Sequence, residues 1–250
     1  MKIGIIGLGL IGGSIFKDLV KLGYDVIAVS NSQNGEKIYK DYNVLKDCDV
    51  VFVCSAMNKT LSILDKLEDI LNEETIVTDV CSLKQFVCNK KRPYKFIPSH
   101  PMAGTEHKGF ENSFEGLFKN AKWVITPIYG NDDRLIKIIN DLGAKIVETT
   151  PEKHDEAVAL ISHMPMVIAQ AIFKTASENP LALEIASSGF RDMTRLAMSN
   201  TEMANDMVMM NSDNIQTSIL KLYKSIGDLT NSDYLEQINE IKLNRQSMFL

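Results

Sequence analysis

The chain has 250 residues, of which 45% are hydrophobic and 24% charged, as is typical of a globular protein with one large or two modest domains. Its net charge of −5 argues against a nucleic-acid partner, which would require a basic face. No apolar run reaches the length of a membrane span, and the glycine-rich apolar N-terminus lacks the cleavage site of a signal peptide.

Residues 1–150 alternate between short β-branched runs and helical stretches. The run KIGIIG predicts a strand, and a helix follows from Gly9 to Leu22. Further strands are predicted at DVIAVS, CDVVFVCS, ETIVTDV, YKFIPS, KWVITPI and AKIVETT. Strands that alternate with crossover helices predict one parallel sheet covered on both faces, and therefore an α/β domain.

Residues 151–250 contain no strand-like run and predict an all-helical domain. Pro151 lies near the border between the two domains. The predicted helices are Glu152–Ser177, Leu181–Ala186, Asp192–Met210, Asn211–Gly227 and Asp233–Phe249.

The four cysteines of the chain form no CxxC pair. They are Cys48, Cys54, Cys81 and Cys88, and two of them lie in or beside apolar strands. This pattern favours buried free thiols in a reducing cytosol over a metal site. We therefore expect a cytoplasmic protein without a bound metal.

The stretch GLGLIGG carries the first chemical signal. Gly7, Gly9 and Gly12 form a G-x-G-x-x-G motif between a strand and a helix, which is the context of a Rossmann-type dinucleotide site. The first glycine permits a tight turn, the second lets the backbone approach a pyrophosphate, and the third allows close packing of helix and strand. With Leu10 and Ile11, whose N–H groups lie at the helix N-terminus, these residues are the predicted phosphate site.

The end of the second strand bears on the choice of cofactor. A carboxylate that would bind the ribose 2′-OH of NAD is absent there, and Ser30, Asn31 and Ser32 take its place, with Lys37 close in sequence. We expect NAD(P) with a slight preference for NADP, although no arginine supports it. Ser55, after the third strand, is a further predicted cofactor contact.

His100 is the predicted base. It lies in SHPMAGTE between Pro98 and Pro101, which stiffen the loop, and it follows the strand YKFIPS. Ser82, after ETIVTDV, is expected to reach the same region at the carboxyl ends of the strands, where open α/β sheets bind ligands. A neutral imidazole there can accept a proton from a substrate hydroxyl. The alternative is a histidine that only satisfies loop backbone groups.

Two arginines and a histidine are candidates in the helical domain. Arg191 and Arg195, in SSGFRDMTRLAMSN, lie four residues apart on one helical face, and SSG is expected to break the preceding helix. Arginine suits bidentate carboxylate binding, and the apolar neighbours favour a partly buried site over a solvated face. His163, in ISHMPM, is as well explained by a structural role as by a functional one.

Taken together, GLGLIGGS, TDVCSLK, SHPMAGTE, SHMP and GFRDMTRLA resemble, in this order and over nearly the whole chain, the prephenate and arogenate dehydrogenases of tyrosine biosynthesis. The resemblance implies oxidative decarboxylation of prephenate to 4-hydroxyphenylpyruvate, or of arogenate to tyrosine. It also implies a helical domain that binds substrate and forms a homodimer.

The resemblance assigns roles to individual residues. His100 would accept the ring hydroxyl proton, and Ser82 would bond to His100 or to that hydroxyl. Arg195 would bind a substrate carboxylate and would pair with Glu106 near the entrance. The remaining residues expected at the substrate site are Arg191, Thr105, His163 and Met166.

Departures from the family pattern leave the substrate and the cofactor open. Met166 stands where many prephenate-using relatives have a second histidine, so arogenate is the alternative substrate. The acidic residue after the second strand is absent, and the stretch before the third strand is short.

Two other classes of protein share part of this pattern. A β-hydroxyacid dehydrogenase would need a catalytic lysine on the first long helix of the second domain, where only Lys153 and Lys174 occur, near its two ends. A non-catalytic redox sensor would bind the dinucleotide but would need neither the base nor the arginine pair.

Overall fold

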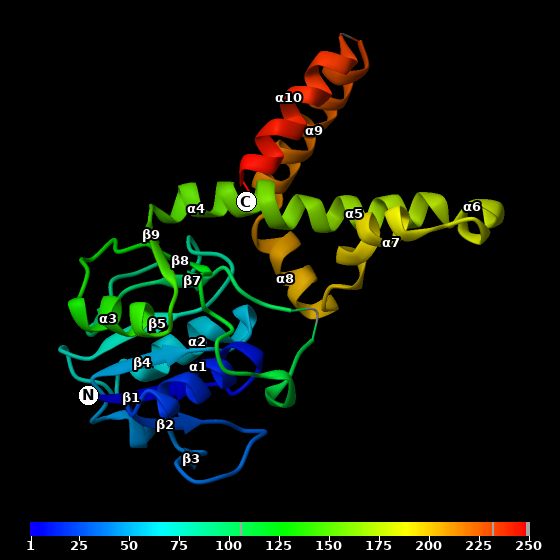
Figure 1. Ribbon diagram of the computed structural model, residues 1–250. Helices are drawn as coiled ribbons and strands as arrows, with labels where there is room; N and C mark the ends of the chain where they lie inside the picture. Colours follow the sequence, from blue (N-terminus) through cyan, green and yellow to red (C-terminus); the bar gives the residue numbers. More distant parts are fainter. Residues whose placement is uncertain (106, 232, 249–250) are drawn as a thin grey trace.

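The computed structural model describes residues 1–105, 107–231 and 233–248. It has an α/β part that ends with β9 and a helical part that begins with α4 (Figure 1). The predicted order of an α/β domain followed by an all-helical domain is confirmed.

A six-stranded parallel sheet forms the centre of the α/β part. Its strand order, β3-β2-β1-β4-β5-β6, is that of the Rossmann fold, and every neighbouring pair is parallel. The two-residue edge strand β3 was not predicted. The strands are β1 (Lys2–Ile6), β2 (Asp25–Val29), β3 (Ile38–Tyr39), β4 (Val50–Val53), β5 (Ile76–Asp79) and β6 (Lys95–Phe96).

A second, three-stranded sheet corrects the prediction of one parallel sheet. It consists of β7 (Ser99–Pro101), β8 (Lys122–Ile125) and β9 (Lys145–Glu148), with β7 antiparallel to β8 and β8 parallel to β9.

The predicted strand YKFIPS is divided between the two sheets. Ile97 N still donates to Val77 O of β5, whereas Pro98 O accepts from Thr126 N beyond β8. Pro98 has no N–H with which to continue the first ladder, so the chain changes sheets at this residue.

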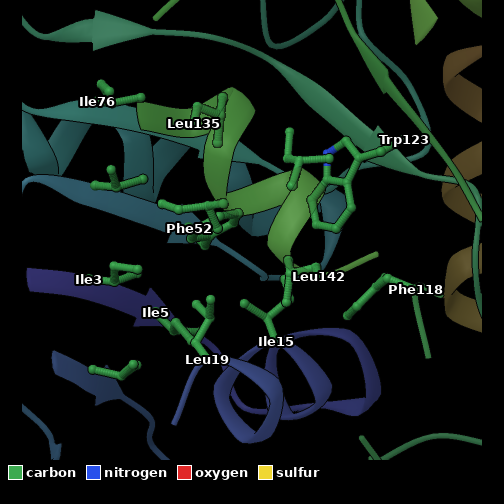
Figure 2. Close-up of a cluster of buried hydrophobic side chains, with 14 of the residues drawn as sticks. Ile3, Ile5, Ile15, Leu19, Phe52, Ile76, Phe118, Trp123, Leu135 and Leu142 are labelled. Atoms are coloured by element: carbon green, nitrogen blue, oxygen red, sulfur yellow. The ribbon is translucent and has the colours of Figure 1, made fainter. Parts of the chain in front are cut away.

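One hydrophobic core joins the two sheets (Figure 2). Trp123 of β8 is fully buried, 6.3 Å from Phe52 of β4 and 5.2 Å from Phe118 between ring centroids. Side chains of β1, α1 and α3 complete the cluster. The helices and 3-10 turns of this part are α1 (Leu10–Lys21), Tyr42–Leu45, α2 (Met57–Leu67), Phe110–Asn112 and α3 (Asp133–Asp141).

The helical part begins directly after β9. Thr150 caps α4 by accepting from Lys153 N, and Pro151 occupies the first helical position, which needs no N–H. The long pair α9 and α10 projects away from the α/β part (Figure 1). The elements are α4 (Pro151–Val158), a π-helical turn (Ala159–His163), α5 (Met164–Ala176), α6 (Pro180–Glu184), α7 (Ser188–Thr194), a 3-10 turn (Arg195–Met198), α8 (Thr201–Met210), α9 (Ser212–Asn231) and α10 (Tyr234–Met248).

Two predicted helix boundaries in this part are wrong. The segment 192–210 is interrupted, because the Asn200 side chain accepts from Met203 N and starts a new helix, α8. The break expected at Ser187–Gly189 is confined to Ser187, the extended N-cap of α7, because Ser188 and Gly189 are already the first residues of that helix.

The helical run from Pro151 to Ala176 also corrects the statement that nothing reaches the length of a membrane span. By length and by a mean hydropathy of 1.5, it qualifies as a candidate span. Core helices of folded domains meet the same criteria, and this run contains the buried polar residues His154, Asp155 and His163.

Candidate active site

The turn from β1 to α1 requires two of its three motif glycines. Gly7 has φ of +90°, and a Cβ on it would lie 2.6 Å from the carbonyl oxygen of Cys54. A Cβ on Gly12 would lie 2.0 Å from the carbonyl oxygen of Gly7. These glycines therefore provide the tight turn and the close packing that the motif predicts.

The remaining motif residues leave the approach to the helix open. A Cβ on Gly9 would meet no atom within 4 Å. Gly9 caps α1 without a side-chain hydrogen bond, and the first helical turn carries no acidic residue. The N–H groups at this helix end, including those of Leu10 and Ile11, thus face a site that favours an anion. The loop fits the pyrophosphate of a dinucleotide.

The loop after β2 turns around Ser30. This serine is buried, and its Oγ accepts from Gln33 N at 3.1 Å, so its hydroxyl proton can still be donated. Asn31 and Ser32 are exposed on the same loop.

A lysine that the sequence reasoning missed lies against this loop. Lys40 Nζ donates to the carbonyl oxygens of Ser30 (2.8 Å), Asn31 (3.1 Å) and Gln33 (2.8 Å). Lys37, which was expected near the cofactor, instead pairs with Asp25 at the start of β2 at 2.9 Å. Lys40 therefore supplies the positive charge on this loop.

Two predicted serines lie beyond the carboxyl ends of β4 and β5. Ser55 Oγ is 2.9 Å from Thr60 Oγ1, and Ser82 Oγ donates to Met57 Sδ at 3.3 Å. Ser82 does not bond to His100 in this structure, so the first of its two expected roles is not seen.

His100 lies within β7, opposite Val124 of β8, which corrects the expectation that it follows a strand of the large sheet. Its Nδ1 is 2.9 Å from Nε2 of His154, and the two rings meet edge to face. No described residue bonds to its Nε2, which is not among the buried unpartnered atoms and so remains accessible.

His154 and Asp155, at the start of α4, are the site residues that the sequence reasoning missed. His154 Nδ1 is 2.7 Å from Asp155 Oδ1, and both side chains are buried. The Asp155 carboxylate accepts the backbone N–H groups of Lys84 (2.8 Å) and Gln85 (3.0 Å). The available signal was an adjacent histidine and aspartate at the domain border.

The surroundings of His100 keep its imidazole neutral. Burial lowers its pKa well below the ordinary 6.5, and nearby positive charge lowers it further, from His154 and His163 when they are protonated and from Lys84. At neutral pH, His100 is therefore a proton acceptor rather than a cation.

His163 and Met166 lie on the helical side of the site. His163 Nδ1 is 3.2 Å from Asn211 Nδ2, and burial lowers its pKa to about 4. Its Nε2 is buried and has no hydrogen-bond partner among the described residues. Met166 is buried in an apolar cluster that joins the two parts of the chain. That cluster also includes Met57, Cys81, Leu83, Val158, Ala204 and Met207.

The arginine pair is exposed within a single chain, so the expected partly buried site is not formed by one chain alone. Arg191 Nε is 3.6 Å from Asp192 Oδ1, and Arg195 has no ion pair with a described residue. Thr105 is exposed, and its Oγ1 accepts from His107 N at 3.2 Å. Glu106 lies outside the described residues.

All four cysteines are free thiols, and burial raises the pKa of Cys81 to about 12. Within residues 1–105, 107–231 and 233–248, no group of three histidine, cysteine, aspartate or glutamate side chains is placed to hold a metal ion.

Two family models match consecutive parts of the chain. Residues 26–148 match the nucleotide-binding domain of prephenate dehydrogenase, and residues 150–242 match its dimerization domain. The prephenate dehydrogenase of Bacillus subtilis strain 168 is 33% identical over 236 residues. That match covers 84% of this chain but only 64% of the relative, so the chain spans less than two thirds of the relative's length.

Solved structures match almost the whole chain. The Synechocystis arogenate dehydrogenase is 32% identical, with a TM-score of 0.81 over 99% of this chain and 97% of that one. The prephenate dehydrogenase of A. aeolicus, in complex with hydroxyphenyl propionate and NAD+, is 26% identical. Its TM-score is 0.86 over 99% of this chain and 98% of that one. The similar proteins are thus named for two different substrates, prephenate and arogenate.

Proposed function

The chain belongs to the prephenate and arogenate dehydrogenase family, and from this membership we propose that it oxidatively decarboxylates prephenate, with arogenate as the alternative substrate, in tyrosine biosynthesis. The observation that carries the proposal is His100, a neutral imidazole with an accessible Nε2. A non-catalytic sensor would not need such a base.

In the proposed reaction, His100 Nε2 takes the proton of the substrate ring hydroxyl. The turn at Gly7, Gly9 and Gly12 would hold NAD(P)+, which would supply the acceptor for the hydride on the carbon that bears this hydroxyl. As the bond to the ring carboxylate breaks, carbon dioxide leaves, the electron pair of that bond completes the aromatic ring, and the ring oxygen regains its proton as a phenol. The chain therefore has to orient the substrate and place the base, and Ser82 is the second proposed contact of the hydroxyl.

We assign the substrate carboxylate to Arg195, with Arg191 and Thr105 as further substrate contacts and Glu106 as the partner of Arg195 near the entrance. Both arginines are exposed in one chain, which suits a site that a second subunit completes. We propose a cytoplasmic homodimer through the helical domain, because large apolar side chains are exposed there. They include Phe173, Leu181, Ile185, Met193, Met198, Leu220, Tyr223, Leu235 and Leu243.

The assay that tests the proposed function follows the absorbance of the reduced nicotinamide with prephenate and with arogenate, each with NAD and with NADP. We expect turnover of prephenate. If dinucleotide binds and neither substrate is turned over, the sensor is the better description.

We propose that NADP is used at least as well as NAD. Ser30 carries no charge to repel a 2′-phosphate, its hydroxyl can donate to one, and Lys40 makes the loop positive. Replacement of Ser30 by aspartate should shift the NADP-to-NAD ratio of kcat/KM toward NAD by about tenfold or more, about 1.4 kcal/mol.

The control for Ser30→Asp is Asn34→Asp, which adds the same charge at an exposed position of the same loop and should leave the ratio nearly unchanged. A wild-type preference for NAD above about tenfold, or equal shifts in the two variants, would contradict the assignment of Ser30.

Met166 is the proposed determinant of substrate choice. A histidine here could donate to the keto or carboxylate oxygens of prephenate and, when charged, would repel the ammonium group of arogenate, whereas methionine does neither. We expect the wild-type enzyme to use arogenate as well, and Met166→His to raise the prephenate-to-arogenate ratio of kcat/KM.

The matched control is Met164→His, which adds a histidine two residues away on the same helix. It should leave the substrate ratio unchanged. Undetectable arogenate turnover by the wild type, or an unchanged ratio in Met166→His, would return Met166 to ordinary packing in the apolar cluster.

A further inference from the structure

The side chains of His100, His154 and Asp155 are linked by hydrogen bonds, which determine which ring nitrogen of each histidine is protonated. Both oxygens of the Asp155 carboxylate accept backbone N–H groups, so this group is an acceptor in the network. His154 Nδ1, at 2.7 Å from Oδ1, must therefore carry its proton. In a neutral His154 ring, Nε2 then holds a lone pair.

The same reasoning extends from His154 to His100. Because His154 Nε2 is an acceptor, His100 Nδ1 must donate across the 2.9 Å contact. A neutral His100 ring then has its lone pair on Nε2, the nitrogen that no described residue contacts. This is the tautomer that a base requires. The opposite tautomer would present an N–H to the substrate hydroxyl and could not accept its proton.

We propose that His154 and Asp155 are positioning residues that hold His100 in its Nδ1-protonated tautomer and share the positive charge it acquires. The inference rests on the proposed dehydrogenase reaction. When the substrate O–H bond breaks and an N–H bond forms at Nε2, His100 becomes an imidazolium. Asp155, His154 and His100 together pass from one negative charge to neutrality, so no uncompensated charge develops. The proton then returns from Nε2 to the phenolate oxygen of the aromatic product, so the reaction releases no net proton and His100 is neutral again.

The contacts of α4 show what holds the pair in place. The Thr150 cap and Pro151 start α4 directly after β9, which places His154 in its first turn. The carboxylate of Asp155 also joins α4 to the backbone after β5. The same bonds could serve only to stabilise the contact between the two domains. The test therefore has to distinguish control of the His100 tautomer from this structural role.

The principal variant is Asp155→Asn in the full-length protein. If the asparagine amide donates to His154 Nδ1, His154 must carry its proton on Nε2 and donate it to His100 Nδ1. Both rings then change tautomer, and the proton of His100 lies on Nε2. We expect kcat to fall by about 10²–10⁴-fold, with dinucleotide affinity unchanged. His154→Gln, whose amide can still donate to Asp155 and accept from His100, should retain more activity than His154→Leu.

The readout independent of activity is ¹⁵N NMR of histidine-labelled protein, which distinguishes the two tautomers, in a chain with only four histidines. We expect His100 to be protonated at Nδ1 in the wild type and at Nε2 in Asp155→Asn. The structural control is Met207→Ala, which loosens the apolar contact between the domains without touching either ring, and should lower stability but keep the tautomer.

Wild-type protonation of His100 at Nε2, or an unchanged kcat in Asp155→Asn, would overturn the proposal. An equal loss of kcat in Met207→Ala would also overturn it, because that result indicates that the network only stabilises the contact between the domains. If the wild type turns over neither prephenate nor arogenate, the proposed function fails, while the tautomer measurement still decides whether the network holds His100 as stated.

Discussion

Replacement of His100 by asparagine is expected to lower kcat by about 10²–10⁴-fold while dinucleotide affinity stays unchanged, since a positioned general base contributes a factor of this size. Asparagine keeps a polar group on β7 but cannot accept the hydroxyl proton. The measurement is steady-state turnover with the better substrate, together with dinucleotide binding by fluorescence titration.

The pH dependence adds a second readout for the same variant. His100 is active when neutral, and its pKa lies well below 6.5, so wild-type kcat/KM should decline only as the pH falls below the range of an ordinary histidine. The asparagine variant should lack this acid limb.

The control is His107→Asn, which replaces an exposed histidine in the segment after β7 and should leave turnover and pH profile unchanged. Near-normal turnover of His100→Asn, or an acid limb that survives the substitution, would remove His100 from the role of base.

The features that the sequence predicted well depend on local patterns. The glycine motif, its strand and its helix are local, and a Cβ on Gly7 or Gly12 would collide with backbone atoms as the motif implies. The pairing partners of strands depend on distant residues instead. No local pattern shows that β7 leaves the parallel ladder at Pro98 and joins β8 in an antiparallel pair.

The candidate site was predicted in part for a similar reason. His100 stood out because two prolines flank it, whereas His154 and Asp155 look like ordinary residues in the first turn of a helix. Their role depends on a contact between residues 54 positions apart in the chain. Likewise, Lys40 acts on backbone carbonyls of its loop, which carry no sequence signal.

The second large effect is expected at Lys84, a fully buried lysine that forms an ion pair with the buried Asp79 at the end of β5. Its Nζ also donates to Ser99 O at 2.6 Å, directly before His100. Lys84→Met should lower the free energy of unfolding by about 3–5 kcal/mol, because the Asp79 charge would stay buried without its counter-charge.

Trp123, the only tryptophan of the chain, reports on this region, since its Nε1 donates to Ser99 Oγ at 3.0 Å. Urea unfolding followed by its fluorescence therefore measures the loss. The matched control is the double variant Asp79→Asn with Lys84→Met, in which no buried charge is left alone. Asparagine can still accept one of the two N–H groups that Asp79 binds, those of Cys81 and Ser99.

The double variant should therefore be more stable than Lys84→Met alone, which would assign the loss to the uncompensated carboxylate rather than to the missing side-chain volume. If both variants lose the same free energy, the ion pair contributes nothing beyond packing. Because Lys84 also holds the backbone that carries His100, the double variant should regain stability without regaining full turnover. That difference would separate the charge of Lys84 from its hydrogen bond to β7.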